Sequence, residues 1–455
     1  ISLATNKIIK LDCNLEKQLG GILDMNSSNN NKQNNFFYGW VIVLACLLIQ
    51  AIPFGVASNL PPTFTNYVVN AEGFSYASFT LIFTIGTFVS AICSPFIGKL
   101  FSKVNAKILF IIGSIFVGAG FMAYSIAGNK LYAYYVIAAI VQVGNAIVSA
   151  IGVPTLINSW FKFNKGTALG IAFCGGGVGN IVLQTLAGKW LNDPSIGYKG
   201  AYLRFGLIAL IGSLLISIFL VRMPKSEAEL AANVPKKKLQ GEEDVAHHVS
   251  WGYTIGEATK MSQFWIIAAS FIFVGFYVSG FALQFIAYFQ SLEASGVLLI
   301  SAALLASMFG LFSIFGNLLG GVLFDKLGLT KCFALAAALV VIAGLCLLFV
   351  GNINALGYLF TLTFGISMFS YVMGPSYMTS SLFGDRDYGA ILGIIQLFFA
   401  VGFAIGTPIF SIILDKTGWT YAWISSIVFA VIAYGGLLIA CTSILKINRE
   451  NNVHE

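Results

Sequence analysis

The chain has 455 residues, of which 58% are hydrophobic and only 9% are charged, and its formal net charge is +7. Soluble proteins carry about 25% charged residues, so a soluble chain this poor in charge could not cover its own surface. Disordered chains are polar, which excludes disorder over the whole length. The composition indicates a protein that crosses the membrane several times. We expect a lipid bilayer around it and no nucleic acid as a partner.

The first residues differ from the rest of the chain. Leu19, Gly20 and Gly21 can be encoded by TTA-GGA-GGA, a purine-rich ribosome-binding sequence a short distance before Met25. We therefore expect translation to start at Met25 in a bacterium, with residues 1–24 an over-extended reading frame and residues 25–37 a cytoplasmic N-terminal tail. The alternative is that residues 1–24 form a real, disordered cytoplasmic tail.

Twelve apolar stretches are long enough to cross a membrane, since a core of ~30 Å requires about 20 residues of helix. A polar stretch, 222–261, separates six of them from the other six and forms a central cytoplasmic loop. The sequence therefore predicts an all-α membrane protein with an N-terminal six-helix half, 38–221, a C-terminal six-helix half, 262–445, and a C-terminal tail, 446–455. The predicted spans are 39–68, 76–98, 107–127, 131–157, 166–188, 203–221, 262–290, 298–323, 331–351, 355–380, 388–412 and 419–445.

The distribution of basic residues predicts the orientation, because cytoplasmic loops are enriched in Lys and Arg. Of the 25 Lys and Arg, three precede Met25. With the N-terminus inside, 17 of the others fall on the cytoplasmic side and five fall outside. We therefore expect a multi-pass protein of the cell membrane with both termini in the cytoplasm. The five outside positions are Lys130, Lys189, Lys199, Arg204 and Lys416.

The two halves repeat each other in sequence. The segment from Gly98 to Lys103 matches the segment from Gly321 to Lys326, and the Gly166–Gly170 pair of glycines recurs as Gly389 and Gly393. Both matches have the same offset of 223 residues. Two independent matches at one offset indicate a duplicated six-helix unit.

Twelve spans, a central loop and this repeat resemble the major facilitator superfamily. Its motif in the loop after span 2, G-x-L-x-D-R-x-G-x-R, occurs as GKLFSKVNAK at 98–107 and as GVLFDKLGLTK at 321–331. The first copy has Ser102 in place of the acidic residue. The resemblance implies secondary transport of a small solute by alternating access. It also implies a gating role for the motif residues Gly98, Ser102, Lys103, Gly321, Asp325, Lys326 and Gly328, in which a carboxylate braces neighbouring helix ends.

Within that superfamily the chain is similar to the monocarboxylate and oxalate–formate exchanger branch. The residues that carry this similarity are Tyr38-Gly39-Trp40, the Lys165–Gly170 segment and the Phe383-Gly384 pair. The similarity implies a small carboxylate substrate, such as a monocarboxylate or an oxalate- or formate-like anion, exchanged by an antiporter. The branch commonly binds its anion with an Arg in span 8, but Asn317 stands at that place and segments 298–323 and 388–412 contain no Lys, Arg or His.

Polar side chains in the spans are the candidates for a substrate site, because the fold places its cavity between the two halves. Gln142 and Asn145 share one face of span 4, and Tyr277, Gln284 and Tyr288 share one stripe of span 7. Each has a structural alternative, since amides in membrane helices often bond a neighbouring helix. The candidates are Gln50, Asn59, Gln142, Asn145, Tyr277, Gln284, Tyr288, Asn317, Tyr371 and Gln396.

Other function classes lack support in the sequence. No catalytic triad or GxxxxGK[ST] phosphate loop occurs, so we expect neither an enzyme nor a bound cofactor. The seven cysteines are scattered and the three histidines lie in polar segments, which predicts no metal site. We expect a monomer without proton coupling by a side chain. Two alternatives stay open: a transport-inactive solute sensor that signals through 222–261, and a facilitator or exchanger for a neutral solute.

Overall fold

Helices form every membrane-crossing segment in the part of the chain that the structure describes. This computed structural model describes residues 37–224, 229 and 251–450. Eleven of its helices are long and apolar enough to cross a membrane, and a bent pair of helices makes a twelfth span. The predicted twelve-helix fold is confirmed. The expectations for residues 1–36 and for most of the central loop concern residues outside the described ones.

The N-terminal half contains spans 1 to 6. Within it α2 and η1 pack against α8, α4 packs against α6, and α5 packs against α6 and α9. Its elements are α2 (Gly39–Ile49), η1 (Gln50–Asn59), α3 (Pro61–Glu72), α4 (Tyr76–Phe101), α5 (Ala106–Ala123), η2 (Tyr124–Ile126), α6 (Leu131–Asn145), η3 (Ala146–Ala150), α7 (Gly152–Trp160), α8 (Lys165–Leu191), α9 (Gly197–Leu215) and η4 (Ile216–Leu220).

The C-terminal half contains spans 7 to 12, and the short helix α11 precedes it. Within this half α12 packs against α18 and α19, while α15 packs against α13 and α14. Its elements are α11 (Ile255–Ala258), α12 (Ser262–Ala294), α13 (Ala302–Leu327), α14 (Leu329–Phe349), α15 (Leu356–Ser367), α16 (Phe369–Val372), α17 (Gly374–Phe383), α18 (Tyr388–Thr417) and α19 (Trp419–Glu450). Span 8 starts at Ala302, four residues after its predicted start. The Glu293 carboxylate accepts the Ala302 N–H at 2.9 Å and so caps the first turn of α13.

Spans 1, 4 and 10 depart from regular α-helix where proline interrupts them. Span 1 contains the π-helical segment η1 with Pro53 inside, and span 4 contains the π-helical segment η3 shortly before Pro154. Span 10 bends by 41° between Val372 and Gly374. Pro375 follows that bend and has no N–H to donate to the carbonyl of Tyr371, so the regular helical ladder cannot continue there.

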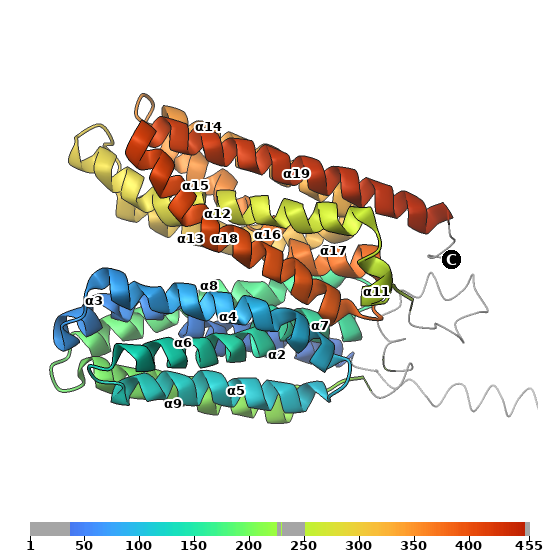
Figure 1. The fold of residues 1–455 in the computed structure, drawn as a ribbon, viewed down its shortest axis with the longest axis horizontal. Helices are drawn as coiled ribbons and strands as arrows, with labels where there is room; N and C mark the ends of the chain where they lie inside the picture. Colours follow the sequence, from blue (N-terminus) through green and yellow to red (C-terminus); the bar gives the residue numbers. More distant parts are fainter. Residues whose placement is uncertain (1–36, 225–228, 230–250, 451–455) are drawn as a thin grey trace, which may run out of the picture. The chain divides into compact units, whose positions relative to one another are not determined.

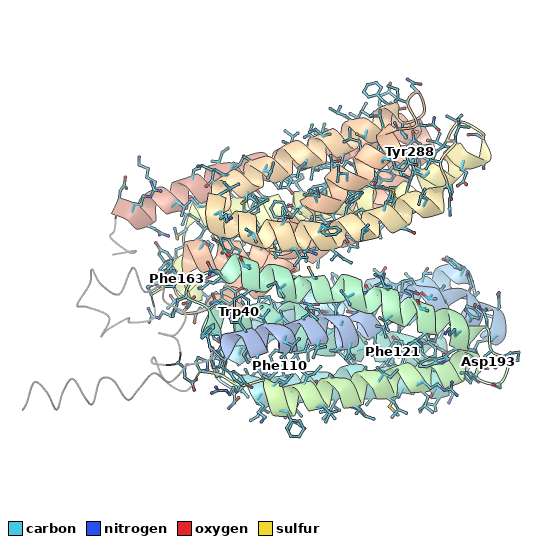
Figure 2. All side chains as sticks on the ribbon, turned by 180° about the vertical axis from the view of Figure 1, so that it is seen from behind. Trp40, Phe110, Phe121, Phe163, Asp193 and Tyr288 are labelled. Atoms are coloured by element: carbon cyan, nitrogen blue, oxygen red, sulfur yellow. The ribbon has the colours of Figure 1, made fainter. Side chains whose placement is uncertain are left out.

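The two halves meet through two pairs of helices, α4 with α18 and α8 with α13. Figure 1 shows the N-terminal half, from blue to green, beside the C-terminal half, from yellow to red, with α7 and α17 near the same end. Figure 2 shows Phe163 and Asp193, which flank α8, at opposite ends of the N-terminal half. Tyr288 of the C-terminal half lies toward the Asp193 end. We call the end that carries Phe163 the linker end, because the central segment leaves and re-enters the bundle there.

Candidate functional site

The amides predicted on span 4 face span 1. Gln142 donates its Nε2–H to the carbonyl of Ala57 at 2.9 Å, and Asn145 donates to Ser58 Oγ at 3.0 Å and to Gln142 Oε1 at 3.2 Å. The carbonyl of Ala57 needs such a donor because Pro61, four residues later, has no N–H. Gln142 therefore completes the hydrogen bonding of a broken helix as well as standing among the candidate site residues.

Two polar atoms of this group remain without a protein partner. Gln50 is 1% exposed, and its Oε1 accepts from Ser149 Oγ at 3.0 Å, but its Nε2 has no hydrogen-bond partner among the described residues. The Oδ1 atom of Asn145 is likewise buried and unpaired. A buried polar atom without a partner costs about 1–3 kcal/mol, so such atoms mark places where a water or a ligand belongs. Asn59, in contrast, donates to the carbonyl of Gly176 at 3.3 Å and ties η1 to α8.

The tyrosines predicted in the C-terminal half lie in two different surroundings. Tyr277 OH bonds Tyr434 OH at 2.8 Å, and Tyr434 OH bonds Ser370 Oγ at 2.6 Å, so a buried hydroxyl chain joins α12, α16 and α19. The hydroxyl of Tyr371 is also buried but has no partner in the described part of the chain. The hydroxyl of Tyr277 is therefore already hydrogen-bonded within the C-terminal half, whereas the hydroxyl of Tyr371 can still donate a hydrogen bond.

The remaining candidates of span 7 and span 11 are more dispersed. Tyr288 packs its ring against Trp419 and Trp423, with centroids 4.9 Å and 5.4 Å away. Gln284 and Gln396 are half-buried. The structure thus brings Gln142 and Asn145 into direct contact with each other and with span 1, and it places the span 7 residues in aromatic and hydroxyl contacts of their own half.

Asn317 lies at the contact between the halves. It is 6% exposed, and its Oδ1 has no partner among the residues described. A Cβ atom placed on Gly170 would lie 2.5 Å from the carbonyl oxygen of Asn317, so α8 and α13 touch at this level. Asn317 therefore stands on α13 where that helix faces the N-terminal half.

Asp325 caps a helix of the opposite half. Its carboxylate accepts the N–H of Gly166 at 2.8 Å, the N–H of Thr167 at 2.7 Å and the hydroxyl of Thr167 at 2.6 Å. These are the first N–H groups of α8, whose own N-cap residue Asn164 offers no side-chain cap. The carboxylate therefore satisfies unpaired donors and places a negative charge at the positive end of the helix dipole. We call this contact the Asp325 latch.

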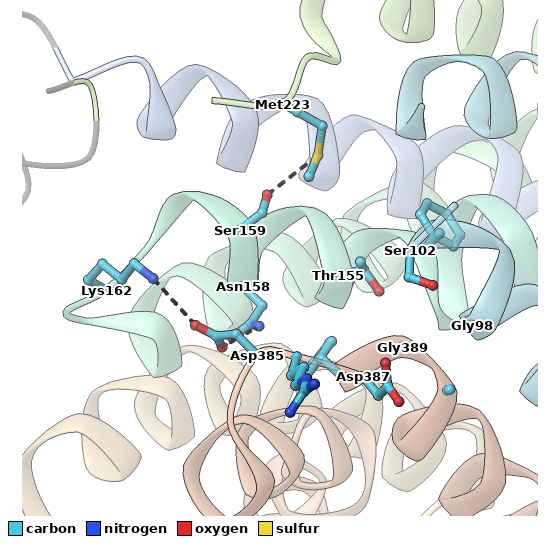
Figure 3. A pocket seen from close by; sticks show the side chains of 14 residues that line it. Gly98, Ser102, Thr155, Asn158, Ser159, Lys162, Met223, Asp385, Asp387 and Gly389 are labelled. Carbon is cyan, nitrogen blue, oxygen red and sulfur yellow. Dashed lines mark hydrogen bonds and ion pairs between the residues drawn. The ribbon is translucent and has the colours of Figure 1, made fainter. Parts of the chain in front are cut away.

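The first copy of the motif makes no equivalent latch. Ser102 Oγ donates to the carbonyl of Lys99 in its own helix at 2.8 Å. The glycine contact is kept, since a Cβ on Gly389 would lie 2.7 Å from the carbonyl oxygen of Gly98. A cavity of about 210 Å³ lies beside it, with Ser102, Thr155 and Gly389 among its lining residues (Figure 3). Lys103 and Lys326 are exposed, and Gly328 adopts a φ of 78° at the end of α13.

Asp385, between α17 and α18, binds three residues of the N-terminal half. Its carboxylate accepts from Asn158 Nδ2 at 2.7 Å and pairs with Lys162 Nζ at 3.4 Å (Figure 3). It also pairs with Lys165 Nζ at 3.3 Å. Lys165 Nζ also donates to Asn158 Oδ1 and to Ser380 Oγ, each at 2.7 Å. We call these five residues the Asp385 clamp. They join the end of α7 and the start of α8 to α17 and the loop that follows it.

Two opposing effects act on the pKa of Asp385. Burial raises the pKa, but the charges of Lys165 and Lys162 and the hydrogen bonds from Asn158 and Lys165 lower it, and the net result lies below the ordinary value. The carboxylate is therefore charged at neutral pH. The sequence analysis missed Asp385, although a signal existed: Lys162 and Asp385 are 223 residues apart, which is the offset of the repeat.

The latch and the clamp both lie at the linker end and both join the two halves. Charge-assisted hydrogen bonds of this kind are about twice as strong as neutral ones, yet they break when the partners separate or a group is neutralised. In the described residues no group of three or more His, Cys, Asp or Glu side chains could hold a metal ion. The arrangement can therefore hold the two halves together at this end by contacts that are reversible.

Comparison with known proteins agrees with this geometry. The family profile described as Major Facilitator Superfamily matches residues 43–381 and 301–450. Among solved structures, the fucose:proton symporter of E. coli has a TM-score of 0.65 at 15% identity, over 90% of this chain and 99% of that one. The human organic anion transporter MFSD10 has a TM-score of 0.60 at 11% identity, over 89% of this chain and 100% of that one.

Similar sequences point to one branch. Monocarboxylate transporter 12-B of Danio rerio is 24% identical over 96% of this chain and 91% of its own length. Human monocarboxylate transporter 12 is 24% identical over 84% and 76%. The riboflavin transporter RibJ of Trypanosoma cruzi is 26% identical over 42% and 40%. The relatives confirm the resemblance to monocarboxylate transporters, and the profile match over most of the spans shows that the chain belongs to the Major Facilitator Superfamily.

Proposed function

We propose that the protein is a secondary transporter that moves a small monocarboxylate by alternating access between its two halves. The observation that carries this proposal is that reversible contacts, the Asp325 latch and the Asp385 clamp, join the two halves at the linker end. The names of the relatives support the substrate class. The positive-inside pattern supports a cytoplasmic position for the linker end, and under this proposal the structure represents a state closed toward the cytoplasm.

The unpaired buried groups are the ones we propose to bind the carboxylate. An anion needs hydrogen-bond donors, and the Nε2 of Gln50 and the hydroxyl of Tyr371 are buried donors without a hydrogen-bond partner among the described residues. The amide of Asn317 can present either its oxygen or its NH₂ group. These three groups would replace the cation that the branch commonly uses, at a lower affinity, since hydrogen bonds to neutral donors are weaker than ion pairs.

A second candidate is an exchanger or facilitator of a neutral solute. The favouring observation is that no Lys, Arg or His occurs in 298–323 or 388–412, so neither span 8 nor span 11 offers a counter-charge within the membrane. A neutral solute would use the same amides and hydroxyls without the cost of burying an uncompensated charge.

Counterflow in proteoliposomes tests both candidates. Vesicles loaded with unlabelled lactate or formate, or in a parallel set with an unlabelled neutral sugar, are diluted into the same compound in labelled form at equal pH and zero voltage. We expect transient accumulation of a monocarboxylate, and accumulation of a neutral solute alone would favour the second candidate. Ligand-dependent thermal stabilisation without any flux would refute transport and favour a sensor.

A further inference from the structure

The residues that follow the central segment pair with the loop that carries Asp385. The Asp385 N–H donates to the carbonyl of Trp251 at 3.0 Å, and the Tyr253 N–H donates to the carbonyl of Phe383 at 2.8 Å. Gly252 and Gly384 form an antiparallel β-bridge between these two bonds. We call residues 251–259 the arm. It is hydrogen-bonded to the backbone of Asp385 itself and to that of Phe383, two residues before the clamp carboxylate.

Two further contacts fix the arm in this register. The N–H of Ile255 donates to Asp387 Oδ2 at 2.8 Å, two residues beyond Asp385. Tyr253 OH donates to Asn448 Oδ1 at 2.7 Å, and Asn448 Nδ2 donates to the carbonyl of Leu382 at 3.0 Å, so the end of α19 is joined to the arm and to α17. The arm therefore holds the residues from 382 to 387 from more than one direction.

The pairing depends on two glycines. Gly252 has a φ of 147°, and a Cβ atom there would lie 2.7 Å from the carbonyl oxygen of Phe383 and 2.9 Å from the N of Asp385. Gly384 has a φ of 74°, and a Cβ atom there would lie 2.5 Å from the carbonyl oxygen of Trp251. Residues with side chains rarely adopt such φ values, and here they would also collide with the opposite strand. Glycine at both positions therefore permits this close backbone pairing, and almost any side chain at either position would break it.

The start of the central segment is attached to the other side of the clamp. The guanidinium of Arg222 lies 4.0 Å from the ring centroid of Tyr38 and 5.1 Å from that of Trp160, and Trp160 Nε1–H donates to the carbonyl of Arg222 at 2.8 Å. Trp160 follows Asn158 in α7, so this anchor stands two residues from a clamp donor. Both ends of the segment that joins the halves are therefore bonded next to the clamp, one on each half.

We infer that the arm is a positioning element for Asp385: its backbone pairing places the carboxylate within reach of Asn158 and Lys165 and so favours closure of the linker end. Asp385 lies in the loop between α17 and α18, and the β-bridge and the Asp387 contact hold this loop against the arm. From this loop the Asp385 carboxylate must reach across to the other half. A change that pulls the arm away would lower the population of the closed end without touching either lysine. The inference rests on the proposed function, because it assumes that this end opens during the transport cycle.

Labelling of a single cysteine tests the inference on the full-length purified protein. Thr155 lines the cavity at the linker end, so Thr155→Cys, in a variant whose seven cysteines are replaced by Ala or Ser, reports opening by its rate of reaction with a polar maleimide. Gly252→Ala should raise the rate about three- to tenfold, the change that follows from loss of one or two hydrogen bonds. The matched control is Gly256→Ala in α11, where a Cβ atom has nothing within 4 Å and the rate should stay at the wild-type value.

A second variant and a second background keep the test decisive. Ile255→Pro removes the donor to Asp387 while proline suits the first position of α11, so it should raise the rate even if Gly252→Ala does not fold. In an Asp385→Asn background neither variant should add more than twofold, because the arm acts through that carboxylate. Equal increases in both backgrounds, or wild-type rates for both arm variants, would overturn the inference. Asp385→Asn itself labelling no faster than wild type would instead refute the proposed opening of this end.

Discussion

Asp325→Asn should open the linker end more than any other single change at the gating motif. The carboxylate accepts three hydrogen bonds from Gly166 and Thr167 and carries the charge that faces the α8 dipole. Asparagine keeps one acceptor oxygen, which can retain at most the two bonds that Asp325 Oδ2 accepts from Thr167, but its NH₂ group then faces the Gly166 N–H and its charge is gone. Hydrogen bonds to a charged group contribute about 1.5–3 kcal/mol each. We take about 2–3 kcal/mol for the whole loss, because Asp325 is partly exposed to solvent.

That loss corresponds to a shift of about 30- to 150-fold in the equilibrium between closed and open forms, since each 1.4 kcal/mol is a factor of ten. The Thr155→Cys reporter should therefore label far faster, and counterflow should fall strongly because the cycle needs a stable closed state. The matched control is Ser102→Ala at the equivalent place in the first repeat, where the side chain bonds only its own helix. Similar and mild effects of the two substitutions would refute the role assigned to the latch.

Four further predictions concern neighbouring groups. Lys165→Met should speed labelling about tenfold or more, whereas Lys162→Met should change it less than about threefold, because Lys165 is 18% exposed with three partners and Lys162 is 42% exposed with one. The lowered pKa of Asp385 means that its stabilisation is present above the ordinary carboxyl range and is lost as pH falls through the lowered pKa. Only the thiolate of the reporter reacts with a maleimide, so the labelling rate is expressed relative to that of a free thiol at the same pH. This ratio should be flat from about pH 8 to 5 and rise below about pH 4, and a rise that persists unchanged in Asp385→Asn would contradict this. Ser102→Asp should slow labelling about fivefold by supplying a cap to α18, because the N-cap residue Asp387 makes no capping bond to that helix and its carboxylate accepts the Ile255 N–H instead. An unchanged rate would show that the cavity cannot accept the carboxylate. Gln50→Ala should raise the KM for a transported carboxylate about tenfold, and an unchanged KM would remove Gln50 from the site.

The fold could be predicted from the sequence because membrane helices are constrained by length and hydropathy alone. The spans around Gly39, Leu329 and Trp419 begin within a few residues of their predicted starts. The ends that differ are set by local polar contacts that hydropathy does not register. Ala302 starts α13 because Glu293 accepts its N–H. Helix α9 begins at Gly197 rather than at residue 203, since the helix includes the more polar residues 197–202 that hydropathy leaves out.

The candidate site was harder to predict because helical periodicity shows which residues share a face but not what that face meets. Gln142 and Asn145 share a face, and that face meets η1, where proline leaves a carbonyl without a donor. Tyr277 was singled out by the same rule, yet its face meets Tyr434 inside its own half. Asp385 lies in a short loop, where periodicity gives no information, and only the repeat offset connects it to Lys162.

The clamp also explains why the repeats had to diverge. Lys162 and Asp385 occupy equivalent positions of the two halves and touch each other, so identical repeats would place two like charges in contact there. Opposite charges at this one position turn a repulsion into an ion pair.

The latch positions are under no such constraint, because Ser102 and Asp325 face different helices, α18 and α8, and a carboxylate could stand at both. Only the second copy of the motif has a carboxylate, Asp325, and a cavity of about 210 Å³ lies beside Ser102 in the first copy. The α8–α13 contact is therefore held by a charged cap, whereas the α4–α18 contact relies on packing around Gly98 and Gly389.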